Sequence, residues 1–262
     1  MSSLRHPNIV QFIGICLHPS SPLPILVMEK LKSQLHQLLI ACPTIPLILK
    51  HSILRDVARG LAYLHPQIIH RDLSAKNILL TTFFTAKICD FGSSLSSAIY
   101  SNARSHELTP YPGERVYMPP EALIDHPMYD CSMDIFSFGH LALFTMIQVP
   151  YIMDYTNNSL FLCLYMQVFP NDLEPSHCDS ICITEVERRG KYFKQLEHEN
   201  QYCELIQLTK DCLHNHAPSR PTAEQILYAL EEMKDNRSTD ELMNAVKQVA
   251  NYSSVNVQSQ YK

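Results

Sequence analysis

Glycine and tryptophan are scarce in this sequence. Only six of the 262 residues are glycine, and none is tryptophan. The first glycine is Gly14, which excludes a glycine-rich phosphate-binding loop from the residues before it, because such loops need glycine where backbone and phosphate approach closely. Positive charge is also in short supply. Lysine and arginine number 21 against 26 acidic residues, a net charge of -5, so we expect no nucleic-acid partner.

Long apolar runs and paired cysteines are missing as well. The most apolar stretch, residues 136–153, is interrupted by His140, Gln148 and Pro150, so it falls short of the roughly 20 apolar residues that a membrane helix needs. We expect no secretory leader at Met1. The nine cysteines show none of the spacings of a disulfide framework. The sequence therefore predicts reduced thiols, a cytoplasmic protein and no membrane segment, and it specifies no oligomeric state.

Several short runs predict β-strands. Residues 9–17 and 25–29 are rich in β-branched residues and predict neighbouring strands joined by a loop. Ile78–Leu80 and Ala86–Cys89 predict two further strands separated by a turn. Residues 93–112 are rich in serine, threonine and proline, which predicts a surface loop.

The remaining apolar segments predict helices. Apolar residues recur at helical spacing over 47–64, directly behind Pro46, as at the start of a helix. Residues 134–147 are apolar on every side, which predicts a buried helix. A third helix is expected over 202–213, and a capping-box pattern opens a fourth at Thr222. The second half of the chain is therefore expected to be mainly helical.

Polar residues gather around the two short central strands. Residues 70–77 read His-Arg-Asp-Leu-Ser-Ala-Lys-Asn, and residues 90–92 read Asp-Phe-Gly. Asp72 and Asn77 lie before one strand and Asp90 follows the other, so a hairpin brings the three together. Phosphoryl transfer needs such oxygen ligands at one point, because the protein places metal ions on the phosphates and aims the acceptor hydroxyl.

These motifs resemble the catalytic loop and the metal-binding turn of eukaryotic protein kinases. The resemblance implies an ATP- and Mg²⁺-dependent protein kinase that phosphorylates protein substrates in signal transduction. By the same resemblance, Asp72 accepts the proton of the substrate hydroxyl, Asn77 holds a second Mg²⁺, and Asp90 chelates the Mg²⁺ that bridges the phosphates. Arg71 is implied to contact a phosphate on the following loop.

A nucleotide site is implied by residues 28–31, Met-Glu-Lys-Leu, which are similar to the gatekeeper and hinge of kinases. The resemblance places adenine against the backbone at Met28, Glu29 and Leu31, with Leu79 beneath the ring. Taken without the other motifs, these residues favour a different reading, with Met28 as a core residue and Glu29 as a solvated strand end. The downstream motifs reverse that preference.

Further motifs resemble the family's structural residues. Asp134 is implied to anchor the catalytic loop by hydrogen bonds, and Arg220 to pair with Glu121 of the Tyr-Met-Pro-Pro-Glu motif. Ser74 replaces the lysine that serine/threonine kinases usually carry two residues after the catalytic aspartate, as in tyrosine kinases, whereas Tyr117 stands where those enzymes carry tryptophan. The mixture suggests the tyrosine-kinase-like or tyrosine kinase group.

The resemblance implies an α+β, two-lobed kinase fold with an incomplete N-terminal β lobe and a mainly helical C-terminal lobe. Residues 1–31 would be a remnant of the N-lobe and hinge, and 32–234 the C-lobe. Within the C-lobe, the activation segment would cover about 90–121, and 157–183 would be an insertion. Residues 235–262 are expected to form a polar tail with one weak amphipathic stretch and a disordered end.

The sequence departs from the family pattern at its start. It contains neither the glycine-rich loop nor the Val-Ala-Ile-Lys strand, both parts of an active kinase. We expect a fragment of a longer kinase, and little or no ATP turnover by these residues alone. The alternative is a catalytically impaired pseudokinase or scaffold. Glu114, where serine/threonine kinases commonly carry threonine, is expected to repel Asp72 or the phosphates.

Overall fold

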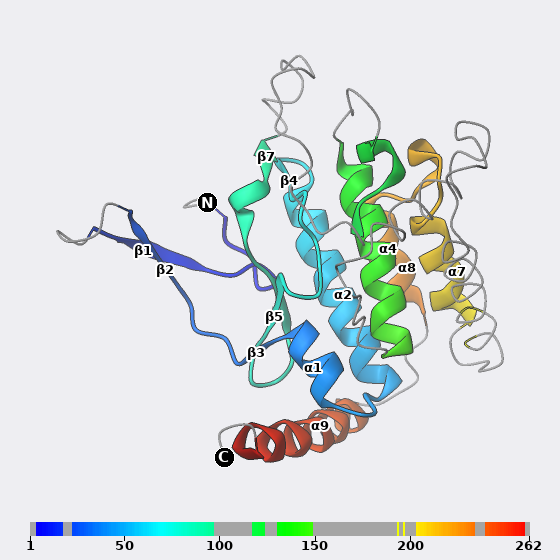
Figure 1. The fold of residues 1–262 in the computed structure, drawn as a ribbon. Helices are drawn as coiled ribbons and strands as arrows, with labels where there is room; N and C mark the ends of the chain where they lie inside the picture. The colour runs from blue at the N-terminus through cyan, green and yellow to red at the C-terminus, as the bar shows by residue number, and fades with distance from the viewer. Residues whose placement is uncertain are drawn as a thin grey trace, which may run out of the picture.

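The computed structural model describes residues 4–17, 23–96, 117–123, 130–148, 193, 196, 203–233 and 239–259. Small strands from the first hundred residues lie beside a body of helices (Figure 1). The α+β class predicted from the sequence is confirmed. No helix in these ranges is long and apolar enough to cross a membrane.

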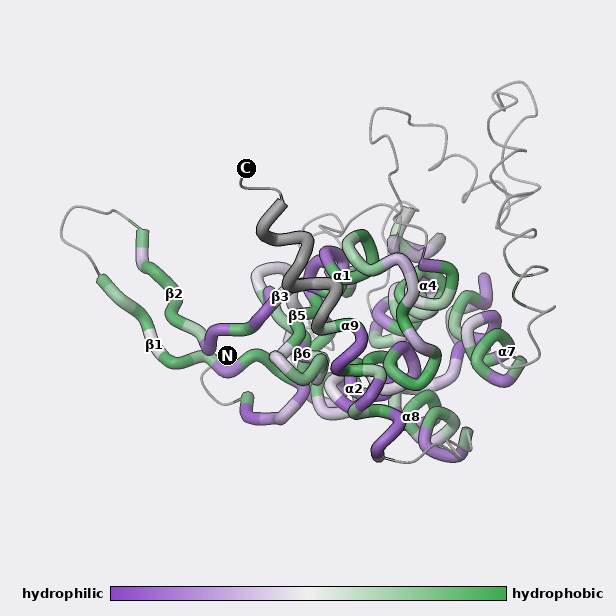
Figure 2. Tube along the Cα trace, turned by 90° about the horizontal axis from the view of Figure 1, so that it is seen from below, coloured by the Kyte–Doolittle hydropathy of each residue, from purple (hydrophilic) through white to green (hydrophobic). Residues whose placement is uncertain are grey.

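A β-hairpin opens the described chain. Strands β1 (Phe12–Cys16) and β2 (Ile25–Met28) pair antiparallel, as predicted, with an irregular register between Phe12 and Gly14. Every residue of β2 is at least 39% exposed. Because successive side chains of a strand point to opposite faces, the hairpin is open to solvent on both faces. Figure 2 shows it projecting from the body and hydrophobic along most of its length.

A three-stranded antiparallel sheet joins this hairpin to the helices. Its order is β3 (Ser33–Gln34), β5 (Ile78–Leu80) and β6 (Ala86–Ile88). Ile88 of β6 also bonds the segment before β1: its N–H donates to the Asn8 carbonyl and its carbonyl accepts from Val10, both at 2.9 Å. The two strands predicted around the polar motifs are therefore confirmed as a hairpin.

The first long helix, α2 (Leu47–Leu64), covers the predicted residues, with Pro46 at the N-cap. It packs against β6 and α8. Gly60 makes the close approach to β6 possible, because a Cβ there would lie 2.8 Å from Cδ1 of Ile88.

The buried helix predicted from residue 134 is α4 (Cys131–Ile147), which starts three residues earlier. Asp130 caps it: the carboxylate accepts the Ser132 N–H at 2.7 Å. Nearly every residue of α4 is buried. Gly139 faces the chain just after α7, since a Cβ there would lie 2.8 Å from Cγ of Leu213.

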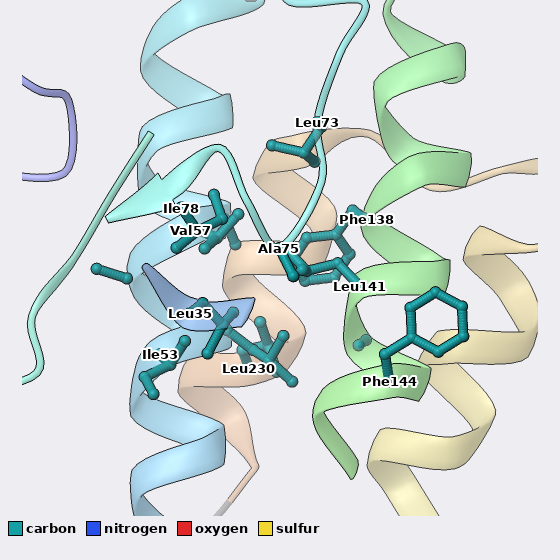
Figure 3. Packing of buried hydrophobic residues seen from close by; sticks show 14 of the residues in the cluster. Leu35, Ile53, Val57, Leu73, Ala75, Ile78, Phe138, Leu141, Phe144 and Leu230 are labelled. Carbon is teal, nitrogen blue, oxygen red and sulfur yellow. The ribbon is translucent and has the colours of Figure 1, made fainter. Parts of the chain in front are cut away.

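Two of the helices packed around α2 and α4 were also predicted. They are α7 (Cys203–Cys212), against α4, and α8 (Ala223–Glu232), against α2. The capping box that opens α8 is formed, with Thr222 and Gln225 bonding each other's backbone N–H. Figure 3 shows side chains of α1 (Leu35–Ala41), α2, α4 and α8 converging on one core.

The prediction of a disordered C-terminal end was wrong for residues 239–259, which the structure describes. Residues Thr239–Ser259 form helix α9, which lies across α1 and α2 (Figure 1). Ala245, Val246 and Val249 are buried. These residues belong to the weak amphipathic stretch that was predicted in this segment, and its contact with α1 and α2 stabilises the helix.

The loop predicted over 93–112 also begins differently. Leu95–Ser96 form a short strand, β7, that pairs with β4 (Ile68–Ile69). A two-residue strand is fixed by its partner rather than by local propensity, so composition gives no sign of it.

Candidate active site

The polar loop after β4 is anchored by a carboxylate of α4. Asp134 is fully buried. Its Oδ2 accepts the backbone N–H of His70 at 2.7 Å, and its Oδ1 accepts that of Arg71 at 2.9 Å. Nε2–H of His65 donates to Oδ2 at 3.1 Å. The predicted anchoring role of Asp134 is confirmed.

The anchor is ionised at neutral pH. Burial raises the pKa of Asp134, because the interior disfavours the charged form. The hydrogen bond and charge of His65 and the hydrogen bond from the His70 N–H together outweigh burial and hold the pKa below its ordinary 3.8. A buried charge with all its partners in place is the stable form of such a group.

His70 connects the loop to the end of β6. Its Nδ1 accepts the Asp72 N–H at 3.3 Å, so the ring proton resides on Nε2, which donates to the carbonyl of Cys89 at 2.9 Å. The ring also stands edge-on to Phe91, with centroids 5.2 Å apart. Both nitrogens are therefore satisfied inside the protein, and the loop is tied to the residue before Asp90.

Asp72 and Asn77 lie against each other in this loop. Nδ2 of Asn77 donates to the backbone carbonyl of Asp72 at 2.8 Å and to its Oδ2 at 2.9 Å. Because both amide protons are directed at Asp72, the amide oxygen is the atom that Asn77 offers to a cation. Leu73 and Ala75 are buried in the core (Figure 3) and hold the loop from below.

The β5–β6 hairpin brings Asp90 next to this pair. The Asn77 carbonyl accepts the Cys89 N–H at 2.9 Å, and Asp90 follows directly. Asp90 is exposed, has left-handed backbone angles (φ 62, ψ 76), and accepts the Gly92 N–H on Oδ1 at 3.2 Å. Left-handed backbone is uncommon outside glycine and gathers at functional positions. The hairpin predicted to gather Asp72, Asn77 and Asp90 is thus present.

Cys89, beside this cluster, is chemically quiet. Burial, which contributes most, and the charges of Asp90 and Asp72 together raise the pKa of its thiol to about 12. The thiol is therefore protonated at neutral pH and is no nucleophile.

Arg71 is also left-handed, with φ 66, and is 1% exposed. The loop that it was predicted to contact is described only up to Ser96, because residues 97–116 lie outside the described ranges. Most of the phosphorylation sites that the sequence suggests lie in that gap, and Glu114 and the insertion over 157–183 are also outside the described ranges. The suggested sites are Ser96, Ser97, Tyr100, Ser101, Ser105 and Thr109.

The predicted hinge follows β2. Met28 is 41% exposed, which argues against its reading as a core residue. Glu29 and Leu31 are half-buried. The Glu29 carboxylate accepts from Nζ of Lys87 at 2.7 Å and from the Gln11 N–H at 2.8 Å. Glu29 is therefore an engaged side chain rather than a solvated strand end.

Leu79 lies on β5, the middle strand of the three-stranded sheet. Its neighbours Ile78 and Leu80 are fully buried on the core side, whereas Leu79 is half-buried. Strand alternation directs its side chain to the opposite face of the sheet, away from the helical core.

The predicted pair of Glu121 and Arg220 is formed. Nη1 and Nη2 of Arg220 donate to Oε1 and Oε2 of Glu121 at 2.5 and 2.8 Å. Nε donates to the carbonyl of His214 at 2.8 Å, and the guanidinium lies 4.8 Å from the centre of the Phe136 ring. This fork fixes η4 (Pro120–Leu123) to the helical body.

Three side chains at the site were not predicted. His65 supports Asp134, Lys87 binds Glu29, and Tyr117 reaches the loop of residues 70–77 with its hydroxyl. Each acts across 42 or more residues of sequence, so no local pattern reveals the contact.

Comparison with known proteins identifies the family. Residues 1–229 match the model of the protein kinase domain. The chain is 29% identical over 248 residues to dual specificity testis-specific protein kinase 2 of Rattus norvegicus, covering 92% of this chain and 38% of the relative. It is 38% identical over 146 residues to serine/threonine-protein kinase CTR1 of Arabidopsis thaliana, covering 53% and 17%.

A third relative is RasGEF domain-containing serine/threonine-protein kinase X of Dictyostelium discoideum, 40% identical over 140 residues, 53% of this chain and 14% of that protein. The chain spans well under half the length of these relatives. The family implied by the motifs, and the α+β kinase fold, are confirmed. This chain belongs to the protein kinase family.

Proposed function

We propose that this chain carries the catalytic loop and metal-binding turn of a protein kinase that transfers the γ-phosphate of ATP to Ser/Thr or Tyr hydroxyls of protein substrates. The observation that supports this most is the arrangement of Asp72, Asn77 and Asp90 at one end of the β5–β6 hairpin. The buried Asp134 anchor holds the loop that carries two of them.

The donor atoms suit Mg²⁺. Asp90 presents an exposed carboxylate, and Asn77 presents an amide oxygen because its protons bind Asp72. Hard oxygen donors of this kind are the ligands that Mg²⁺ takes, alongside phosphate oxygens. Bound Mg²⁺ would neutralise charge on the phosphates. Asn77 and Asp90 would hold the Mg²⁺. Arg71 belongs to the same loop as Asn77.

Asp72 is the proposed proton acceptor for the substrate hydroxyl. Asn77 fixes one of its carboxylate oxygens by a 2.9 Å hydrogen bond, and the backbone on its N-terminal side is fixed by Asp134 through Arg71. A general base has to be oriented before it is useful. Asp72 is half-buried, so it is both oriented and accessible.

Adenine is proposed to bind along Met28, Glu29 and Leu31. The Glu29 N–H already donates to the Gln11 carbonyl at 3.0 Å. The backbone groups that would form hydrogen bonds with adenine are therefore the Glu29 carbonyl and the Leu31 peptide. Leu79, on the sheet face away from the helical core, would pack beneath the ring.

The proposed regulation follows the family resemblance. Arg71 is proposed to bind a phosphate on the loop that begins after β7, which would make phosphorylation there a signal.

The six cysteines that the structure describes are free thiols, which agrees with a reducing compartment. We place the protein in the cytoplasm on that basis.

The test is phosphate transfer by the purified chain from γ-labelled ATP to a mixed Ser/Thr/Tyr peptide pool with Mg²⁺. We expect slow transfer, since this sequence contains neither the glycine-rich loop nor the lysine strand. Asp72→Asn should abolish it, whereas Asp211→Asn, an exposed control on α7, should not. Signal insensitive to Asp72→Asn, or no signal above a blank, would favour the scaffold reading.

A further inference from the structure

Tyr117 stands between the helical body and the catalytic loop. It is 7% exposed, and its backbone carbonyl accepts from Oγ of Ser137 on α4 at 2.8 Å. Its ring stands edge-on to Phe144, with centroids 5.5 Å apart at 89°, and near His140, at 6.4 Å. Both its backbone and its ring are therefore held by α4, nearly all of whose residues are buried.

The hydroxyl of Tyr117 points from this anchor to the catalytic loop. It accepts the backbone N–H of Ala75 at 3.2 Å. The carbonyl of Ala75 in turn accepts the N–H of His36, at the start of α1, at 2.9 Å. Ala75 is 4% exposed, so water has little access to replace the tyrosine. An unsatisfied buried N–H is costly, so the loop is held where the hydroxyl is.

Ala75 lies midway between Asp72 and Asn77. Asp134 fixes the loop at residues 70 and 71, and β5 fixes it beyond 77. The hydrogen bond of the Ala75 N–H is thus a polar restraint in the middle of the segment that carries the proton acceptor and the amide ligand, in addition to the buried side chains of Leu73 and Ala75. Rotation of this peptide would displace both side chains together.

We propose that Tyr117 is a positioning residue for phosphate transfer, whose hydroxyl sets the Asp72–Asn77 loop through the Ala75 N–H. This rests on the proposed kinase function. Tyr117 belongs to the same described segment as Glu121, which Arg220 holds. The hydrogen bond of the Tyr117 hydroxyl therefore couples the position of the Asp72–Asn77 loop to the docking of residues 117–123 on the helical body. If this segment undocks, the loop loses that hydrogen bond.

The test is Tyr117→Phe, which removes the hydroxyl and keeps the ring. Amide hydrogen exchange of peptides covering 73–78 should rise by about five- to tenfold in the native protein, as expected for loss of a hydrogen bond worth roughly 1 kcal/mol. Tyr63→Phe is the matched control, because the Tyr63 hydroxyl accepts the Arg5 N–H at 3.1 Å in the same manner. It should leave exchange at 73–78 unchanged.

Transfer kinetics supply the second readout. Tyr117→Phe should lower kcat by about tenfold and leave KM for ATP unchanged, because a small misplacement of catalytic groups costs rate rather than adenine contacts. Unchanged exchange at 73–78 in Tyr117→Phe, or an equal rise in Tyr63→Phe, would overturn the proposal. Exchange is measured without nucleotide, so it decides the positioning role even if Asp72→Asn shows that the chain transfers no phosphate.

Discussion

Asp134→Asn is the substitution that probes the loop anchor most sharply. The wild-type carboxylate accepts three hydrogen bonds, from the His70 and Arg71 N–H groups and from His65. An asparagine oxygen can keep the two on the His70 side, which places the new NH₂ group against the Arg71 N–H. The hydrogen bond from the Arg71 N–H is lost, and this N–H then faces the new NH₂ group in the interior. The two remaining hydrogen bonds are weaker because their acceptor is no longer charged.

The cost follows from these changes. A hydrogen bond to a buried charged group contributes about 1.5–3 kcal/mol, and a buried donor without an acceptor costs about 1–3 kcal/mol. We therefore expect Asp134→Asn to lower the free energy of unfolding by about 3–5 kcal/mol, out of the roughly 5–15 kcal/mol of a typical domain. Urea unfolding followed by circular dichroism measures it. Phosphate transfer should fall in parallel, because the loop loses its position.

The same substitution at Asp130 is the control. Asp130 caps the same helix from an exposed position, and asparagine caps about as well as aspartate. Its cost should stay below about 0.5 kcal/mol. Equal costs for the two variants, or a cost below about 1 kcal/mol for Asp134→Asn, would refute the view that Asp134 anchors the loop.

The pKa of Asp134 adds a pH signature. Because its folded pKa lies below the ordinary 3.8, the ionised group stabilises the fold fully above about pH 4–5 and loses that contribution as the pH falls through the folded pKa. Asparagine does not titrate. The stability gap between wild type and Asp134→Asn should therefore shrink on acidification below pH 4, and a constant gap would contradict the assignment.

Three further predictions concern packing, the buried ion pair and the thiol. Arg220→Lys should lower the free energy of unfolding by about 2–4 kcal/mol, because lysine cannot reproduce the two-pronged contact, whereas Arg59→Lys, in an exposed pair, should cost under about 0.5 kcal/mol. Gly139→Ala should cost about 1–3 kcal/mol through overpacking against α7, while Gly14→Ala, with nothing within 4 Å of its Cβ, should not. Cys89 should resist iodoacetamide at pH 8 in the native protein, since its pKa is about 12, although the exposed cysteines react.

Each of these has a contrary result. Equal denaturation midpoints for the two arginine variants would show that the buried fork contributes nothing beyond charge. A melting temperature unchanged by Gly139→Ala would mean that the contact with Leu213 relaxes freely. Mass spectrometry that finds Cys89 alkylated as fast as Cys16, which is exposed, would show that burial does not protect the thiol.

Much of the site could be predicted because its residues are close in sequence or carry a distinctive pattern. Asp72, Asn77 and Asp90 flank two short strands with a tight turn, so local rules suffice to bring them together. The apolar residues that recur at helical spacing along α2, and the nearly continuous apolar run of α4, likewise identify those helices.

The rest depended on tertiary contacts. The Glu29–Lys87 pair and the hydroxyl bond of Tyr117 join segments 58 and 42 residues apart, and local periodicity carries no information on such partners. Of helix α9 only a weak amphipathic stretch was predicted, because its apolar stripe is narrow. Strand β7 was missed because two residues are too short to show alternation.

The most direct test of the central claim, that Asp72, Asn77 and Asp90 form one Mg²⁺–nucleotide site, is calorimetric titration of the purified chain with ATP in the presence and absence of Mg²⁺. We predict binding that strengthens with Mg²⁺, and at least a tenfold loss of that strengthening in Asp90→Asn, since the main carboxylate ligand is removed. Asp211→Asn should bind as wild type does. Equal Mg²⁺ dependence in wild type and Asp90→Asn would contradict the account.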